Sequence, residues 1–187
     1  MRKQVLVMFL AAFSLVTSVN AQKIVAGVKL DNSITVEGQS LTLNGAGIRE
    51  KMWIDLYVGS LYLPKKSSNA SEIINSKDFA IIKLDIVSGL ITSEKMINAV
   101  NEGFEKATNG KTASLKIKID QFKSYFKEEF SKGDSFSIIN TPNGVAVYKN
   151  GTKKGTIEGY DFKVALFGIW LSNSPADKDL KAAMLGK

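Results

Sequence analysis

Between residues 24 and 63, short stretches in which apolar residues dominate or alternate with polar ones predict β-strands. The turn-forming pair Asp31-Asn32 should separate the first two strands. Pro64 should end the last one, because proline has no N–H to donate to a neighbouring strand. The predicted strands are Val25–Leu30, Ile34–Val36, Leu41–Leu43 and Trp53–Leu63.

The middle of the chain follows a helical period, interrupted by one strand. Phe79–Val87 is rich in β-branched residues and predicts that strand, whereas Ser71–Ser76 predicts a short helix before it. Ser93 can cap a longer amphipathic helix, and a second amphipathic helix should run to about Phe130. The apolar faces of these two helices are Met96, Ile97, Val100 and Phe104, then Leu115, Ile119, Phe122 and Phe126.

The last third predicts a β-meander followed by helices. Two Asn-Gly pairs, at 143–144 and 150–151, are flanked by strand-like runs within Gly133–Gly159, which is a strong hairpin signal. Asp161 can cap the apolar helix Val164–Leu171, which is too short to cross a bilayer and should therefore be buried. Asp177–Leu185 predicts a final short helix. This order of elements indicates an α+β fold with a mostly antiparallel sheet.

The first residues have the composition of a secretory signal peptide. Arg2 and Lys3 form a positive start, Val5–Val16 is apolar, and Val19-Asn20-Ala21 supplies small residues for cleavage. We therefore expect residues 1–21 to be removed and residues 22–187 to form a single domain that is secreted, in the periplasm. An uncleaved membrane anchor is the alternative interpretation of the same segment.

Composition excludes several kinds of chemistry. The chain has no cysteine and no histidine, so it has no thiol nucleophile, no Ser-His-Asp triad and no His-ligated zinc. No Asp-x-Asp-x-Asp pattern occurs, and we predict neither a metal nor a cofactor. The formal net charge is +7, but the lysines are dispersed among acidic residues, which does not favour a nucleic-acid partner.

Arg49 is the one arginine outside the predicted signal peptide. A guanidinium presents five fixed donors and keeps its charge when desolvated, so it suits recognition of a carboxylate or a polarised oxygen. A structural ion pair, with Glu50 or Asp55 as the partner, explains the residue nearly as well.

Tyr57 is the candidate partner of Arg49. It lies eight residues later, across a predicted short hairpin turn, so the two side chains can converge from adjacent strands. A phenol beside a guanidinium makes a receptor for a carboxylate or an enolate oxygen. Gly45-Ala46-Gly47 should form a bend that aims Arg49; without a third glycine and a βαβ unit it does not predict a dinucleotide site.

The chain resembles the chalcone isomerase-like family. The resemblance rests on Gly45-Ala46-Gly47-x-Arg49, the following strand Val58–Leu63, and the end Phe167–Leu171 leading through Pro175. It extends over most of residues 22–187 and implies an open-faced β-sandwich, in which a large antiparallel sheet carries helices on one face. In the plant chalcone isomerases, the arginine that matches Arg49 holds the substrate and stabilises its oxyanion.

The site residues that the resemblance implies differ from those of the plant enzymes. Tyr57 stands where the family has a catalytic threonine, and the helix Ser93–Asn101 lacks the catalytic tyrosine. An arginine with a tyrosine resembles instead the non-catalytic fatty-acid-binding branch, which grips a carboxylate and buries its tail. The resemblance thus implies a binder of fatty acids or similar amphiphilic carboxylates, with Arg49 and Tyr57 as ligand-binding residues. We expect the protein to be a monomer.

Two other functions remain open at this point. One is an isomerase or intramolecular lyase of the chalcone isomerase type, in which Arg49 and Tyr57 would be catalytic. The other is a structural or interaction module with no small ligand, in which Arg49 would serve the fold.

Overall fold

The computed structural model describes residues 23–187, and the predicted signal peptide lies outside this range. Seven strands form one antiparallel sheet in which each strand pairs with the next one in the chain. They are β3 (Ser33–Val36), β4 (Gln39–Lys51), β5 (Ile54–Leu63), β6 (Ala80–Ile86), β7 (Ser135–Thr141), β8 (Gly144–Lys149) and β9 (Thr152–Ile157). A separate two-stranded hairpin precedes them, formed by β1 (Lys23–Val25) and β2 (Val28–Leu30).

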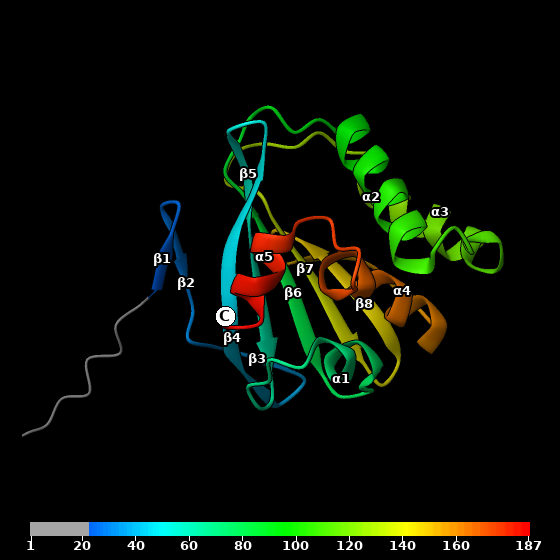
Figure 1. The fold of residues 1–187 in the computed structure, drawn as a ribbon, viewed down its shortest axis with the longest axis horizontal. Coiled ribbons are helices and arrows are strands. Elements are labelled where there is room, and N and C mark those ends of the chain that lie inside the picture. Colours follow the sequence, from blue (N-terminus) through cyan, green and yellow to red (C-terminus); the bar gives the residue numbers. More distant parts are fainter. Residues whose placement is uncertain (1–22) are drawn as a thin grey trace, which may run out of the picture.

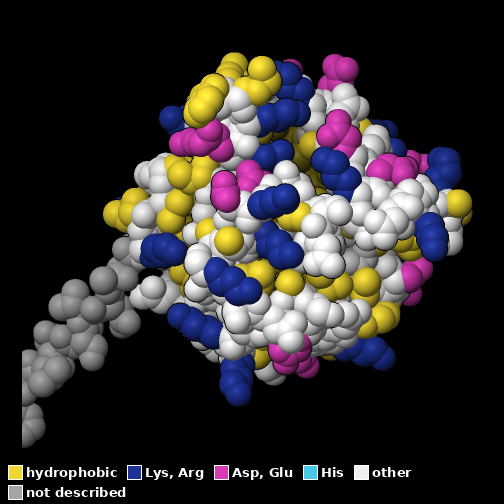
Figure 2. Space-filling view, in the orientation of Figure 1, with side chains coloured by type: hydrophobic (Ala, Val, Ile, Leu, Met, Phe, Trp, Pro, Cys, Tyr) yellow, Lys and Arg dark blue, Asp and Glu magenta, His cyan; other side chains and the backbone are white. Residues whose placement is uncertain are grey.

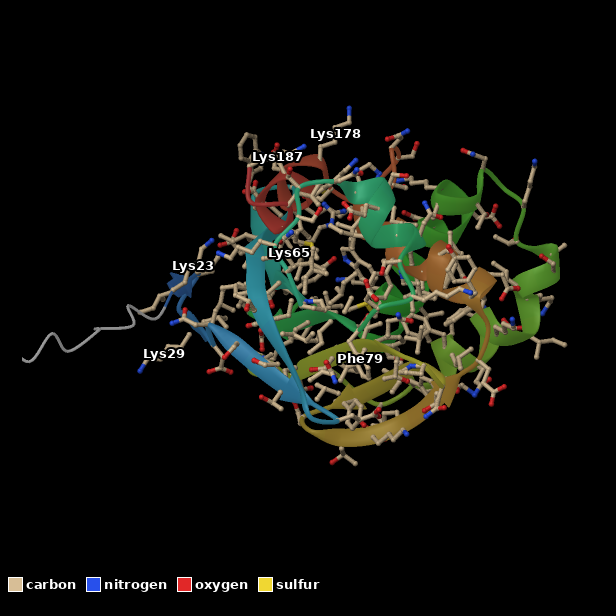
Figure 3. All side chains as sticks on the ribbon, turned by 90° about the horizontal axis from the view of Figure 1, so that it is seen from below. Lys23, Lys29, Lys65, Phe79, Lys178 and Lys187 are labelled. Carbon is tan, nitrogen blue, oxygen red and sulfur yellow. The ribbon has the colours of Figure 1, made fainter. Side chains whose placement is uncertain are left out.

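The helices lie on one face of the curled sheet (Figures 1 and 3). In the described chain they are α1 (Ala70–Asn75), α2 (Ser93–Thr108), α3 (Lys116–Ser124), α4 (Tyr160–Leu171) and α5 (Lys178–Met184), with a 3₁₀ turn at Ala113–Leu115. Helix α4 packs against α1 and α2, whereas α5 packs directly on β4. This arrangement confirms the predicted α+β class and the open-faced sandwich.

Alternation along the strands divides the apolar residues between two cores. In β6, Ile82 and Leu84 face the helices, whereas Ile81 belongs to the core on the opposite face. In β5, Leu61 and Tyr62 divide in the same way. The larger core contains the edge-to-face aromatic pairs of Phe122 with neighbouring phenylalanines and most of α4.

One charged side chain is buried within the helical layer. Lys163 of α4 is 2% exposed, and its Nζ donates to the carbonyl oxygens of Ile73, Ile74 and Ser76 at 2.7–2.8 Å. These carbonyls end α1, where no further helical N–H can reach them. Lys163 therefore fastens α1 to α4. No helix among residues 23–187 has the length and apolarity needed to cross a membrane.

The strand predictions were wrong in two places near the start. Residues 25–30 form a tight hairpin about Ala26-Gly27, both at positive φ, rather than one strand. Gly45-Ala46-Gly47 is not a bend, because strand β4 continues through it with a single register shift between Leu43 and Gly45. These glycines serve packing instead, as the contacts of α5 described below show.

Helix ends differ from the predictions by a few residues. Thr92, not Ser93, caps α2 by accepting from the N–H of Lys95. Helix α3 ends at Ser124 rather than near Phe130, although Phe126 and Phe130 still pack in the core. Helix α4 begins four residues earlier than predicted, after Gly159.

Candidate ligand-binding site

Arg49 and Tyr57 face each other on neighbouring strands, as the sequence predicted. They are direct partners in the register between β4 and β5, so their side chains leave the same face of the sheet. That face is the one covered by helices, because Tyr57 belongs to the larger core. The turn that joins the strands, Met52-Trp53, contains two residues, and both have positive φ as in a type I′ turn.

Arg49 forms an ion pair, but with neither of the neighbours considered from the sequence. Its Nη1 donates to Oδ2 of Asp177 at 2.9 Å and to the carbonyl oxygen of Glu50 at 2.7 Å. The side chains of Arg49 and Asp177 are 21% and 13% exposed. Among residues 23–187, Nε and Nη2 of Arg49 make no hydrogen bond. Two edges of the guanidinium therefore still have donors for a further acceptor.

Asp177 is held in place by the start of α5. Its Oδ1 accepts from the backbone N–H groups of Asp179 and Leu180 at 2.8 and 2.9 Å, so it is the N-cap of the helix. The other oxygen is thereby directed to Arg49. Sequence reasoning placed the helix here but missed this contact, because Asp177 lies 128 residues away from Arg49.

Three glycines bring α5 close to the strands that carry Arg49 and Tyr57. A Cβ atom at Gly47 would lie 2.5 Å from Cβ of Ala183, and one at Gly59 would lie 3.0 Å from a methyl group of Leu180. A Cβ atom at Gly45 would overlap the carbonyl oxygen of Ala183. The missing side chains thus let α5 pack against the sheet, and this close packing places Asp177 beside Arg49.

Tyr57 is 8% exposed, and its hydroxyl is bound from the helical layer. The indole Nε1 of Trp170 in α4 donates to the Tyr57 hydroxyl oxygen at 3.1 Å. The hydroxyl retains its own proton to donate. Burial raises the pKa of Tyr57, although the Trp170 bond and the nearby Arg49 charge oppose this rise. The phenol is therefore a neutral donor at physiological pH.

The surface near the end of the molecule that carries the β4–β5 hairpin tip is hollowed. Figure 2 shows a depression below the tip of the β4–β5 hairpin, with apolar side chains inside it and both basic and acidic side chains around it. Two further hollows, of about 350 and 240 Å³, lie near Pro64 and between α2 and α3. Neither of these two is lined by Arg49 or Tyr57.

The site has the composition of a receptor for a carboxylate with an apolar body. It combines a fixed cation, a neutral phenol donor and an apolar core that continues behind Tyr57. The described residues hold no group of three or more acidic side chains that would suit a metal ion.

Comparison with known proteins decides the family. The family model described as chalcone isomerase-like matches residues 22–186. The chain belongs to the chalcone isomerase-like family. A solved structure of similar fold is that of a fatty-acid binding protein from Arabidopsis thaliana, with a TM-score of 0.67 and 18% sequence identity. The alignment covers 87% of this chain and 95% of the Arabidopsis chain. No curated protein sequence gives a significant match.

Among chalcone isomerase-like proteins, this chain therefore has the family fold together with an arginine and a tyrosine on adjacent strands. Because the identity to the Arabidopsis structure is low, that likeness concerns the fold. The chemistry of the site follows from the residues of this chain.

Proposed function

We propose that this chalcone isomerase-like protein is a non-catalytic binder of fatty acids or similar amphiphilic carboxylates, acting as a monomer in the periplasm after cleavage of its signal peptide. The observation that carries the proposal is the cross-strand pairing of Arg49 with Tyr57 on the helix-covered face. The Arabidopsis protein of similar fold, which is named as a fatty-acid binding protein, supports the same ligand class.

The carboxylate would be held by donors that the fold leaves available. Nε and Nη2 of Arg49 and the hydroxyl proton of Tyr57 can converge on two carboxylate oxygens. Asp177 already shows that a carboxylate is accommodated on this guanidinium, at 2.9 Å. A ligand carboxylate can bind beside Asp177 or displace it from Nη1.

The apolar tail would enter the core between the sheet and the helices. Ile91 and Met96 are buried members of this core, 6% and 7% exposed. Methionine is flexible and adapts to irregular partners. Each CH₂ group of a buried tail contributes about 0.8 kcal/mol, so a long chain can offset the displacement of such side chains.

The test uses two variants that break the same ion pair. Delipidated wild-type protein, Arg49→Gln and Asp177→Asn are titrated with laurate, palmitate and oleate, and with methyl palmitate as an uncharged analogue. We expect Arg49→Gln to bind fatty acids at least tenfold more weakly, because a charged hydrogen bond contributes about 1.5–3 kcal/mol. Asp177→Asn keeps the guanidinium and its Oδ1 cap, so its affinity should equal or exceed that of wild type.

A purely structural Arg49 gives a different pattern. Both variants would then lose thermal stability to the same extent, and fatty acids would bind equally to all three proteins or to none. Equal affinity of wild type for palmitate and methyl palmitate would also contradict the proposal, because the ester offers no carboxylate charge to Arg49.

A further inference from the structure

The tip of the β4–β5 hairpin exposes large apolar side chains. Met52 is 81% exposed and Trp53 is 95% exposed, while Ile54 beside them is 39% exposed. They lie together at one end of the molecule, where Figure 2 shows a group of apolar side chains over the hairpin. At 95% exposure, the Trp53 side chain contributes almost no buried apolar surface to the stability of the fold.

The backbone at the tip makes this choice of residues more unusual. Met52 and Trp53 have φ of 52° and 66°, in the left-handed region that asparagine and glycine adopt with less strain. A two-residue hairpin turn with two positive φ angles favours Asn-Gly for this reason. Two bulky side chains therefore occupy strained positions without any burial to offset the strain. This combination points to a role outside the folded chain.

The surroundings of the tip indicate what it contacts. The segment after β6 is bound to the base of the hairpin, where the N–H groups of Val87 and Ser88 donate to the carbonyl oxygen of Leu56. Leu90 in this segment is 55% exposed, which adds a further apolar side chain at this end. Exposed cations accompany it: Lys51 adjoins Met52, and Nζ of Lys95 donates to the carbonyl oxygen of Leu90.

We propose that the hairpin tip is a docking site for a lipid bilayer, with Met52 and Trp53 inserted at the boundary between head groups and acyl chains. Tryptophan prefers this boundary, because its ring is apolar and its N–H is polar. Lys51 and Lys95 would contact anionic head groups, and the positive net charge that residues 22–187 keep without Arg2 and Lys3 favours approach to such a surface. Glu50 and Asp55 form the next pair down the hairpin, which limits insertion to the tip.

This proposal is independent of Arg49 and of the bound ligand. Docking by the tip would also place the hollow described above next to the bilayer, since both lie at the same end of the molecule (Figure 2). An amphiphile could then pass between lipid and protein without crossing water. Failure of vesicle binding would leave carboxylate binding intact, and the two are measured separately.

The test measures sedimentation of residues 22–187 with vesicles of phosphatidylcholine and phosphatidylglycerol. We expect wild type to co-sediment and its tryptophan emission to shift to shorter wavelength. The shift would report Trp53, because the other tryptophan, Trp170, is only 5% exposed and so is shielded from water before vesicles are added. The double variant Met52→Asn, Trp53→Gly should bind at least tenfold more weakly while melting at the same or a higher temperature, because Asn-Gly suits the turn.

The matched control is Ile117→Asn, which removes an 84% exposed side chain from α3, away from the hairpin. It should bind vesicles as wild type does. Absence of vesicle binding by wild type, or equal binding by the double variant, would overturn the proposal. Tip-dependent self-association without vesicle binding would also overturn it, and would assign the tip to a second copy of the chain.

Discussion

At Arg49, one guanidinium serves both a structural contact and a proposed ligand contact. The ion pair with Asp177 is only partly buried, and such pairs contribute modestly to stability, since solvent still screens them. The unused donors at Nε and Nη2 are harder to explain by structure alone, because no residue of the described chain accepts from them. The ion pair positions the guanidinium, and the ligand carboxylate would accept from the donors at Nε and Nη2.

Tyr57→Phe separates the structural and ligand roles of the phenol. The change leaves the Trp170 N–H buried without its acceptor, which should lower the free energy of unfolding by about 1–3 kcal/mol. It also removes the hydroxyl donor, so palmitate affinity should fall while the shape of the site is kept. Chemical denaturation and a palmitate titration on the same sample measure the two effects. Unchanged palmitate affinity in a folded variant would remove Tyr57 from the site.

At this scale the sequence predicted the pair but not its environment. The pairing of Arg49 with Tyr57 could be predicted from the sequence, because a short hairpin fixes the register of its two strands. The contacts of Asp177 with Arg49 and of Trp170 with Tyr57 could not be predicted in this way, because both partners come from the helical layer near the end of the chain. Their approach depends on tertiary packing, which has no local signal.

At the scale of elements, the position of α5 is set by the glycines of β4 and β5. The sequence predicted a bend at Gly45-Ala46-Gly47, because glycine favours turns as well as close approach. The structure shows close approach: the backbone of Ala183 lies where a side chain at Gly45 would be. Glycine in a strand often marks a place where another backbone comes near.

Gly45→Ala tests this packing. The added methyl group would force α5 away from β4, and overpacking of this kind costs about 1–3 kcal/mol. Because α5 carries the Asp177 cap, the variant should also loosen the Arg49 ion pair. Thermal unfolding beside the control Gly89→Ala measures the effect, since a Cβ at Gly89 would meet nothing within 4 Å. Equal stability of the two variants would mean that α5 does not depend on this contact.

At the scale of the whole molecule, the order of strands and helices could be predicted because each element has its own apolar period. The Asn-Gly pairs predicted both hairpins of the meander, although the first turn is Pro142-Asn143 and Gly144 already belongs to β8. The buried α4 followed from its apolar composition. The large antiparallel sheet with helices packed on one face came from the family resemblance, which the family match confirms. Alternation alone does not say which face of a sheet a distant helix covers.

The most direct test of the account is the ionisation of a bound carboxyl group. Palmitate labelled at its carboxyl carbon is bound to delipidated protein and followed by carbon NMR as the pH is lowered. If Arg49 and Tyr57 hold the carboxylate, the pKa of the bound carboxyl lies below that of palmitate in water, because an adjacent cation and donors favour the charged form. Arg49→Gln should show no bound signal, or one whose pKa is not lowered. A bound carboxyl that titrates alike in both proteins, or no bound palmitate in wild type, would contradict the account.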